Sequence, residues 1–139
     1  MTAVFKWDNS MSVHITEIDN QHKKLFEMID KFQDELQDAK VNKPIINLID
    51  GLKDYAGYHF KTEESWMKRY NYPQLVTHHN EHQQFIKTVE DFEATLKHAN
   101  TIRPSEISNF LKDWIMKHLA LEDKLFANYL KSNKLLDWL

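Results

Sequence analysis

Apolar side chains recur three and four residues apart along four long segments of this sequence, which is the spacing of an amphipathic α-helix. Pro44, Pro73 and Pro104 separate these segments, and proline suits the first turn of a helix but interrupts its interior. The whole chain contains only 2 glycines and 3 prolines, so few turns are expected. We therefore predict four helices, which cover approximately residues 18–38, 44–70, 75–98 and 104–130.

The connections between the predicted helices are short, and short connections join antiparallel neighbours. The sequence therefore predicts an all-α fold, an up-down-up-down antiparallel four-helix bundle that forms one domain over residues 1–139. The first dozen residues, with Phe5 and Trp7, are expected to lie over the bundle as an ordered arm. The C-terminal residues KLLDWL are expected to form a short apolar extension, and we favour a cap on one end of the bundle over a partner-binding tail.

Polar residues interrupt the inward apolar stripe of every predicted helix. His22 lies on the first stripe, and the second and third stripes carry two polar residues each. The stripe of the fourth helix is predicted to contain Ile107, Leu111, Trp114, His118, Leu121 and Leu125. In an antiparallel bundle, the starts of the first and third helices lie at the same end as the later halves of the second and fourth. These polar side chains are therefore expected to converge.

The converging residues have the chemistry of a metal site. His59 and Glu63 form an HxxxE pair, and His78 and His82 form an HxxxH pair, so each pair lies on one face of its helix. One buried histidine is more often satisfied by hydrogen bonds alone, but two such pairs on adjacent helices, with inward histidines on the other two, favour metal ions. Burying a carboxylate without a partner is costly, and bound cations remove that cost.

Asp123 is the seventh candidate ligand, and it follows His118 by five residues. A regular α-helix does not place residues five apart on one face, whereas a local π-bulge does, and such bulges often occur at functional sites. We therefore predict a distortion of the fourth helix near residues 119–122. The complete set of imidazole nitrogens and carboxylate oxygens suits two transition-metal ions bridged by carboxylates.

Composition limits the ligand chemistry and the partners. The chain contains no cysteine, so any metal must be held by nitrogen and oxygen atoms. The net charge is −3, with both signs interspersed, which is a poor electrostatic footprint for nucleic acid. The N-terminal residues MTAVFKWDNS do not resemble a signal peptide, and no apolar stretch is long enough to span a membrane. We expect a cytoplasmic protein.

Four stretches of the chain closely resemble hemerythrin, and the single-domain bacteriohemerythrins in particular: WDNSMSVHITEIDNQHKKLF, HFKTEESWM, HHNEHQQF and WIMKHLALED. The resemblance covers nearly the whole chain, and all seven candidate ligands stand at the family's spacings. It implies a non-heme centre of two iron ions, with an oxo or hydroxo bridge from solvent, that binds dioxygen. By this resemblance, one iron is bound by His78, His82 and His118. The other iron is bound by His22 and His59, which leave it a position for dioxygen. The two irons are bridged by Glu63 and Asp123.

An apolar pocket beside the metal ions is expected to exclude water and protons. Leu25, one turn after His22, is predicted to line this pocket. Trp114 and Ile115, about one turn before His118, and Leu119, directly after it, are predicted to line it as well. Asp19 is a candidate to cap the first helix or to orient a ligand through a hydrogen bond. His14 stands where bacterial relatives commonly have a small residue. A surface side chain is favoured for it, and a hydrogen bond near the site or an extra metal ligand are the alternatives.

The expected function is reversible dioxygen binding, for transport, storage or delivery to a protein partner that receives the oxygen. Ferritin-like sites use mostly carboxylates, whereas five neutral imidazoles and two carboxylates leave less negative charge around the irons and suit reversible binding. The alternatives are an oxygen or redox sensor module that acts on a partner, a di-iron enzyme that handles peroxide or nitric oxide, and a structural zinc site. We rank an enzyme below a binding protein because the sequence offers no acid, base or substrate pocket beyond the ligands. Seven ligands also exceed what one tetrahedral zinc ion needs.

Overall fold

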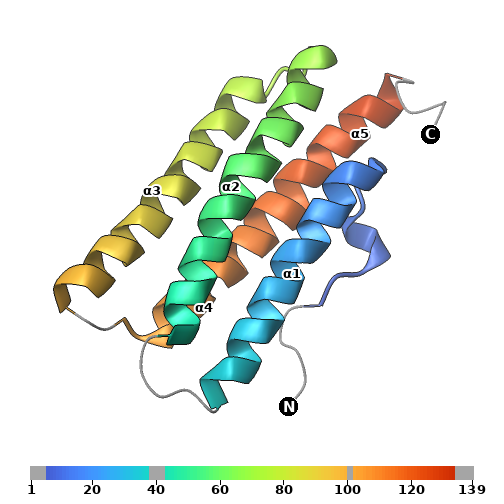
Figure 1. Cartoon of the computed structure of the whole chain (residues 1–139). Helices are drawn as coiled ribbons and strands as arrows, with labels where there is room; N and C mark the ends of the chain where they lie inside the picture. Colours follow the sequence, from blue (N-terminus) through green and yellow to red (C-terminus); the bar gives the residue numbers. More distant parts are fainter. Residues whose placement is uncertain (1–5, 38–42, 100–101, 134–139) are drawn as a thin grey trace.

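The computed structural model describes residues 6–37, 43–99 and 102–133, and within these ranges the chain is mainly helical. Four helical rods pack side by side (Figure 1). The first three are α1 (Thr16–Gln37), α2 (Lys43–Arg69) and α3 (Leu75–Ala99). The fourth rod is continuous but has three parts, which are α4 (Pro104–Trp114), the π-helical segment η2 (Ile115–Asp123) and α5 (Lys124–Ser132). The described residues thus form the predicted all-α four-helix bundle.

Successive helices run in opposite directions. Figure 1 shows the start of α1, the turn between α2 and α3 and the end of α5 at one end of the bundle. The end of α3 and the start of α4 lie at the other end. The predicted up-down-up-down topology is therefore confirmed. Pro104 occupies the first turn of α4, where its missing N–H has no cost. Phe5, Asp38 and the KLLDWL extension lie outside the described residues. In the described part of the chain, every helix is too short or too polar to cross a membrane.

Two apolar clusters fill the bundle, and a layer of buried polar side chains separates them. On α1, Ile18 belongs to the smaller cluster and Leu25 to the larger one, and the buried His22 lies between them. On α2, which runs the other way, the buried Glu63 lies between Phe60 of the larger cluster and Met67 of the smaller one. Because a polar group buried among apolar side chains is costly without a partner, the polar groups of this layer depend on one another or on a bound ion.

The fourth rod departs from a regular α-helix over Ile115–Asp123, which confirms the predicted distortion and extends it beyond residues 119–122. Residues five apart share a face in a π-helix, and Asp123 is therefore fully buried. The prediction that Leu121 and Leu125 face inward is wrong, because their side chains are 53% and 46% exposed. The extra residue in the π turn moves the buried stripe along by one position, so these leucines rotate outward.

The N-terminal arm, which contains the 3-10 turn η1 (Asn9–Met11), is fastened to α1 and α5. Asp19, in the first turn of α1, accepts hydrogen bonds from the Ser12 hydroxyl (2.6 Å) and the Val13 amide (2.9 Å). Lys124 of α5 donates to the carbonyl oxygen of Ser12 (3.1 Å). Both carboxylate oxygens of Asp19 are thus engaged by the arm. This residue holds the arm, and the suggestion that it orients a metal ligand is not supported by the described contacts.

His14 lies in this arm with a φ of 61°, in the left-handed region that favours glycine and that histidine tolerates better than most residues. Its side chain is exposed, and its backbone N–H donates to the hydroxyl oxygen of Ser12 (3.0 Å). The structure therefore places this side chain at the surface, which was the favoured interpretation. The left-handed backbone also explains why glycine, which has no Cβ, would suit the position.

Candidate metal centre

Seven ionisable side chains from all four helical rods are buried in one layer of the bundle. Each is at most 2% exposed, and they are His22, His59, Glu63, His78, His82, His118 and Asp123. Gln21 is the one further buried polar side chain within the described ranges. The structure therefore brings every predicted ligand into the layer, and it does so because each lies on the inward face of its helix or π turn.

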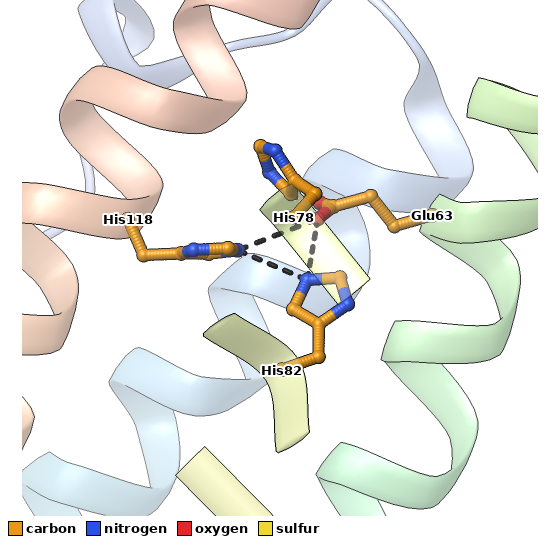
Figure 2. A group of neighbouring side chains, drawn as sticks. All are labelled: Glu63, His78, His82 and His118. Atoms are coloured by element: carbon orange, nitrogen blue, oxygen red, sulfur yellow. Dashed lines mark hydrogen bonds and ion pairs between the residues drawn. The ribbon is translucent and has the colours of Figure 1, made fainter. Parts of the chain in front are cut away.

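One group of donors consists of Glu63, His78, His82 and His118, each with one atom within 4.8 Å of the others (Figure 2). The Nε2 atom of His82 lies 3.0 Å from Glu63 Oε1 and 3.0 Å from His118 Nε2. The Nε2 atoms of His78 and His118 each lie 3.5 Å from the same Glu63 oxygen. Three imidazoles from two helical rods thus surround one carboxylate oxygen.

The second group consists of His22, His59, Glu63 and Asp123, also within 4.8 Å of one another. The Nε2 atoms of His22 and His59 are 3.1 Å apart. His22 Nε2 lies 3.1 Å from Asp123 Oδ2, and His59 Nε2 lies 3.3 Å from Glu63 Oε2. This group therefore has two imidazoles where the first has three.

The two carboxylates divide their oxygens between the groups. Glu63 presents Oε1 to the three-histidine group and Oε2 to His59. Asp123 presents Oδ1 to His78 (2.7 Å) and Oδ2 to His22 (3.1 Å). One oxygen on each side is the arrangement of a carboxylate that bridges two ions.

The donor atoms approach one another as ligands of a common ion do. Ligands held at right angles about 2.1 Å from one ion are about 3.0 Å apart, close to the shortest separations in both groups. Glu63 Oε2 and Asp123 Oδ2 accept no hydrogen bond, although imidazole nitrogens lie nearby. The donors are therefore aimed at common points between them, which fits two metal ions.

The carboxylates also make the layer attractive to positive charge. Burial lowers the pKa of the His118 imidazole, but the charge on Asp123 and contacts with neighbouring glutamates outweigh burial and raise this pKa to about 10. Burial likewise lowers the pKa of His22, whereas Asp123 and Glu63 raise it to about 9. Burial raises the pKa of the Glu63 carboxyl, yet attraction to His59 and the other imidazoles holds it well below its usual range. The layer thus favours ionised carboxylates beside cations.

Comparison with known proteins assigns this arrangement to a family. Residues 13–130 match the family model described as the hemerythrin HHE cation binding domain. The chain belongs to the hemerythrin family. It is 34% identical over 130 residues to a bacteriohemerythrin of Clostridium acetobutylicum, which covers 90% of this chain and 100% of that protein. It is 28% identical over 134 residues to a bacteriohemerythrin of Stenotrophomonas maltophilia, covering 94% and 84%. A crystal structure of a hemerythrin point mutant has a TM-score of 0.81 and 26% identity, covering 91% of this chain and 97% of that one.

In this member of the hemerythrin family, three candidate ligands are oriented from outside by oxygen atoms. His59 Nδ1 lies 2.7 Å from Gln21 Oε1, and the amide nitrogen of Gln21 donates to Thr62. His82 Nδ1 lies 2.7 Å from Glu64 Oε2, and His118 Nδ1 lies 2.9 Å from Glu81 Oε1. An amide oxygen and an ionised carboxylate can only accept, so Nδ1 carries a proton in all three histidines. When the imidazole is neutral, as a metal ligand must be, its Nε2 lone pair faces the centre.

The sequence reasoning missed these outer partners, which are Gln21, Glu64 and Glu81. Each is the chain neighbour of a candidate ligand, but it contacts a ligand on a different helix. A histidine that binds a metal nearly always donates its second N–H, so polar neighbours of the ligands were a usable signal for the class of residue. The pairing itself depends on how the helices pack and cannot be read from spacing along one helix.

The predicted apolar pocket residues are all buried beside the layer. Leu25 is 0% exposed, Ile115 4% and Leu119 1%, and Trp114 is 9% exposed. Trp114 stacks on His118, with ring centroids 3.9 Å apart and an angle of 11° between the planes. Phe60, which sequence reasoning did not assign to the site, stacks on His82 at 3.9 Å and 4°. Aromatic and aliphatic side chains thus cover the side of the layer that faces the larger apolar cluster.

Tyr55 also belongs to this cover, one turn before His59 on α2. Its ring stacks on the His59 imidazole at 4.9 Å and 19°. Burial raises the pKa of the Tyr55 phenol well above its usual range, the charges on Glu63 and Asp123 raise it further, and the nearby Trp114 indole lowers it slightly. The phenol and the indole are close, but their geometry falls short of a hydrogen bond.

Proposed function

We propose that this chain binds dioxygen reversibly at a centre of two iron ions. The observation that carries the proposal is that seven buried candidate ligands divide into two groups joined by two carboxylates. Imidazole and carboxylate ligands suit several transition metals, and membership of the hemerythrin family favours iron among them. The resemblance to bacteriohemerythrins favours dioxygen as the ligand.

The proposed ligand assignment follows the two groups. His78, His82 and His118 would hold one iron, and His22 and His59 would hold the other. Glu63 and Asp123 would be shared between the two, with a solvent-derived oxo or hydroxo group as a further bridge. The iron with two histidines has one protein ligand fewer, so we assign dioxygen to its side of the centre.

When bound, the iron pair supplies the electrons that hold dioxygen, and the chain supplies the surroundings. Gln21, Glu64 and Glu81 keep protons on the outer Nδ1 atoms of three histidines and direct the inner Nε2 atoms to the metals. The side chains of Leu25, Ile115 and Leu119 keep water away from the dioxygen side. Exclusion of water and of stray protons is what allows oxygen to leave unchanged.

We propose carriage of oxygen rather than its catalytic use. Five imidazoles and two carboxylates place less negative charge around the metals than a carboxylate-rich site does, which disfavours strong oxygen activation. Transport, storage and delivery to a protein partner are all uses of the same reversible binding.

The proposal is tested by loading metal-free protein with ferrous iron under argon and recording the visible spectrum while oxygen and argon are cycled. We expect an absorption that appears under oxygen and disappears under argon over repeated cycles. His59→Ala is expected to abolish the cycle. His98→Ala is the matched control, because it removes an exposed histidine from α3, and should cycle like wild type. A wild-type spectrum that never returns under argon would reject reversible binding.

A further inference from the structure

Two hydrogen-bond donors lie in the apolar cover of the candidate metal centre without a partner. The Tyr55 hydroxyl and the Trp114 indole N–H belong to side chains that are 6% and 9% exposed, and neither makes a hydrogen bond. Buried tyrosine and tryptophan usually find a partner for these groups, because an unpaired buried donor is destabilising. Two unpaired donors in one place therefore call for an explanation.

The rings that carry the two donors contact candidate ligands directly. Tyr55 stacks on His59 and Trp114 stacks on His118, so each contacts a different group of candidate ligands. Both rings also pack against Phe85, with centroids 6.0 Å from Tyr55 and 4.6 Å from Trp114. The rings therefore lie together next to the metal layer, and neither polar group has a partner in the described structure.

Stability alone does not account for the Tyr55 hydroxyl. Phenylalanine has the same shape without the hydroxyl, and it would spare the metal-free protein an unpaired donor. Residues that depart from the most stable choice are commonly found at functional sites. What these donors lack is an acceptor, and a small ligand bound at the centre supplies one.

We propose that Tyr55 O–H and Trp114 N–H donate hydrogen bonds to the small ligand held at the two-iron centre. The inference rests on the proposed function, since the ligand is held by the metals. It adds a preference for ligands whose outer atoms accept hydrogen bonds, such as dioxygen and azide. Tyr55 contacts His59, so it serves the side of the centre to which dioxygen is assigned.

The test compares Tyr55→Phe with wild type in three measurements. Azide titration of the oxidised iron-loaded protein should give a Kd about tenfold higher in the variant than in wild type. Release of dioxygen from the oxygenated protein should be about tenfold faster in the variant. Both changes are what the loss of one hydrogen bond to a charged acceptor predicts. Iron content should not change. The melting temperature of the metal-free variant should equal or exceed that of wild type.

Tyr72→Phe is the matched control, because Tyr72 is also buried (7% exposed) and its ring lies 6.1 Å from His78, in the smaller apolar cluster. It should leave azide and dioxygen binding unchanged. An unchanged azide Kd in Tyr55→Phe would overturn the inference. So would a metal-free melting temperature several degrees lower, because it would show that ordered water satisfies the hydroxyl. If wild-type dioxygen binding proves irreversible, the proposed function fails, while the azide comparison still decides the role of Tyr55.

Discussion

Leu119→Asn tests whether apolar packing protects the oxygen side of the proposed centre. Leu119 follows His118 in the π-helical segment, and its side chain is 1% exposed. Asparagine is close to leucine in size but brings an amide that attracts water into the cover. We expect the oxygenated iron-loaded variant to convert to the oxidised form faster than wild type, because water and protons reach the centre.

The same substitution has a stability cost that the structure allows us to work out. Loss of one fully buried leucine side chain costs about 1.5–3 kcal/mol. Burial of an amide without partners adds about 1–3 kcal/mol. The total of about 2.5–6 kcal/mol is a large part of the stability of a typical domain, about 5–15 kcal/mol. With a urea slope of about 2 kcal/mol per molar, the unfolding midpoint of the metal-free protein should fall by about 2 M.

Leu121→Asn is the control for this experiment, because Leu121 lies in the same π segment but is 53% exposed. Its free energy of unfolding should change by no more than about 0.5 kcal/mol, and its oxidation rate should match wild type. Urea unfolding of the metal-free proteins and stopped-flow oxygen binding followed by slow oxidation separate the two effects. Equal losses in both variants would refute the register shift, and equal oxidation rates in Leu119→Asn and wild type would refute the protective role.

Three further substitutions test other parts of the account. Glu63→Ala should lose iron and melt at a lower temperature than wild type. Lys53→Ala, which removes an exposed ion pair with Glu93, should keep the iron content and the melting temperature of wild type. Full iron content in Glu63→Ala would show that the bridge is misassigned. His14→Gly should keep both irons and the oxygen spectrum, and its free energy of unfolding in urea should rise by about 0.5 kcal/mol because the backbone φ at this position is 61°. Loss of iron in this variant would place His14 in the site. Gly57→Ala should raise the free energy of unfolding by about 0.5–1 kcal/mol, since the added Cβ meets nothing within 4 Å inside a helix, and a lower value would contradict this.

The fold and the candidate ligands could be predicted because both depend on spacing along single helices. His59 and Glu63 stand four apart, which places them on one face of any α-helix. The five-residue interval from His118 to Asp123 was informative because it fits a π turn and not an α turn. The antiparallel topology then required these residues to meet at one level of the bundle.

The remaining features depend on contacts between helices or on the extent of the π segment. Leu121 and Leu125 were placed inward because an α-helical period was continued through a π-helical segment of 9 residues. The partners Gln21 and Glu64 act on histidines of neighbouring helices, and no interval within one helix encodes such a pairing. The unpaired hydroxyl of Tyr55 also became apparent only when its surroundings were known.

Stoichiometry of iron binding tests the central claim most directly. Metal-free protein is titrated with ferrous iron under argon, desalted, and analysed for iron per chain. The two groups of buried donors, joined by Glu63 and Asp123, predict a plateau at two irons per chain. A plateau at one iron per chain would contradict the two-ion centre, and with it the function built on that centre.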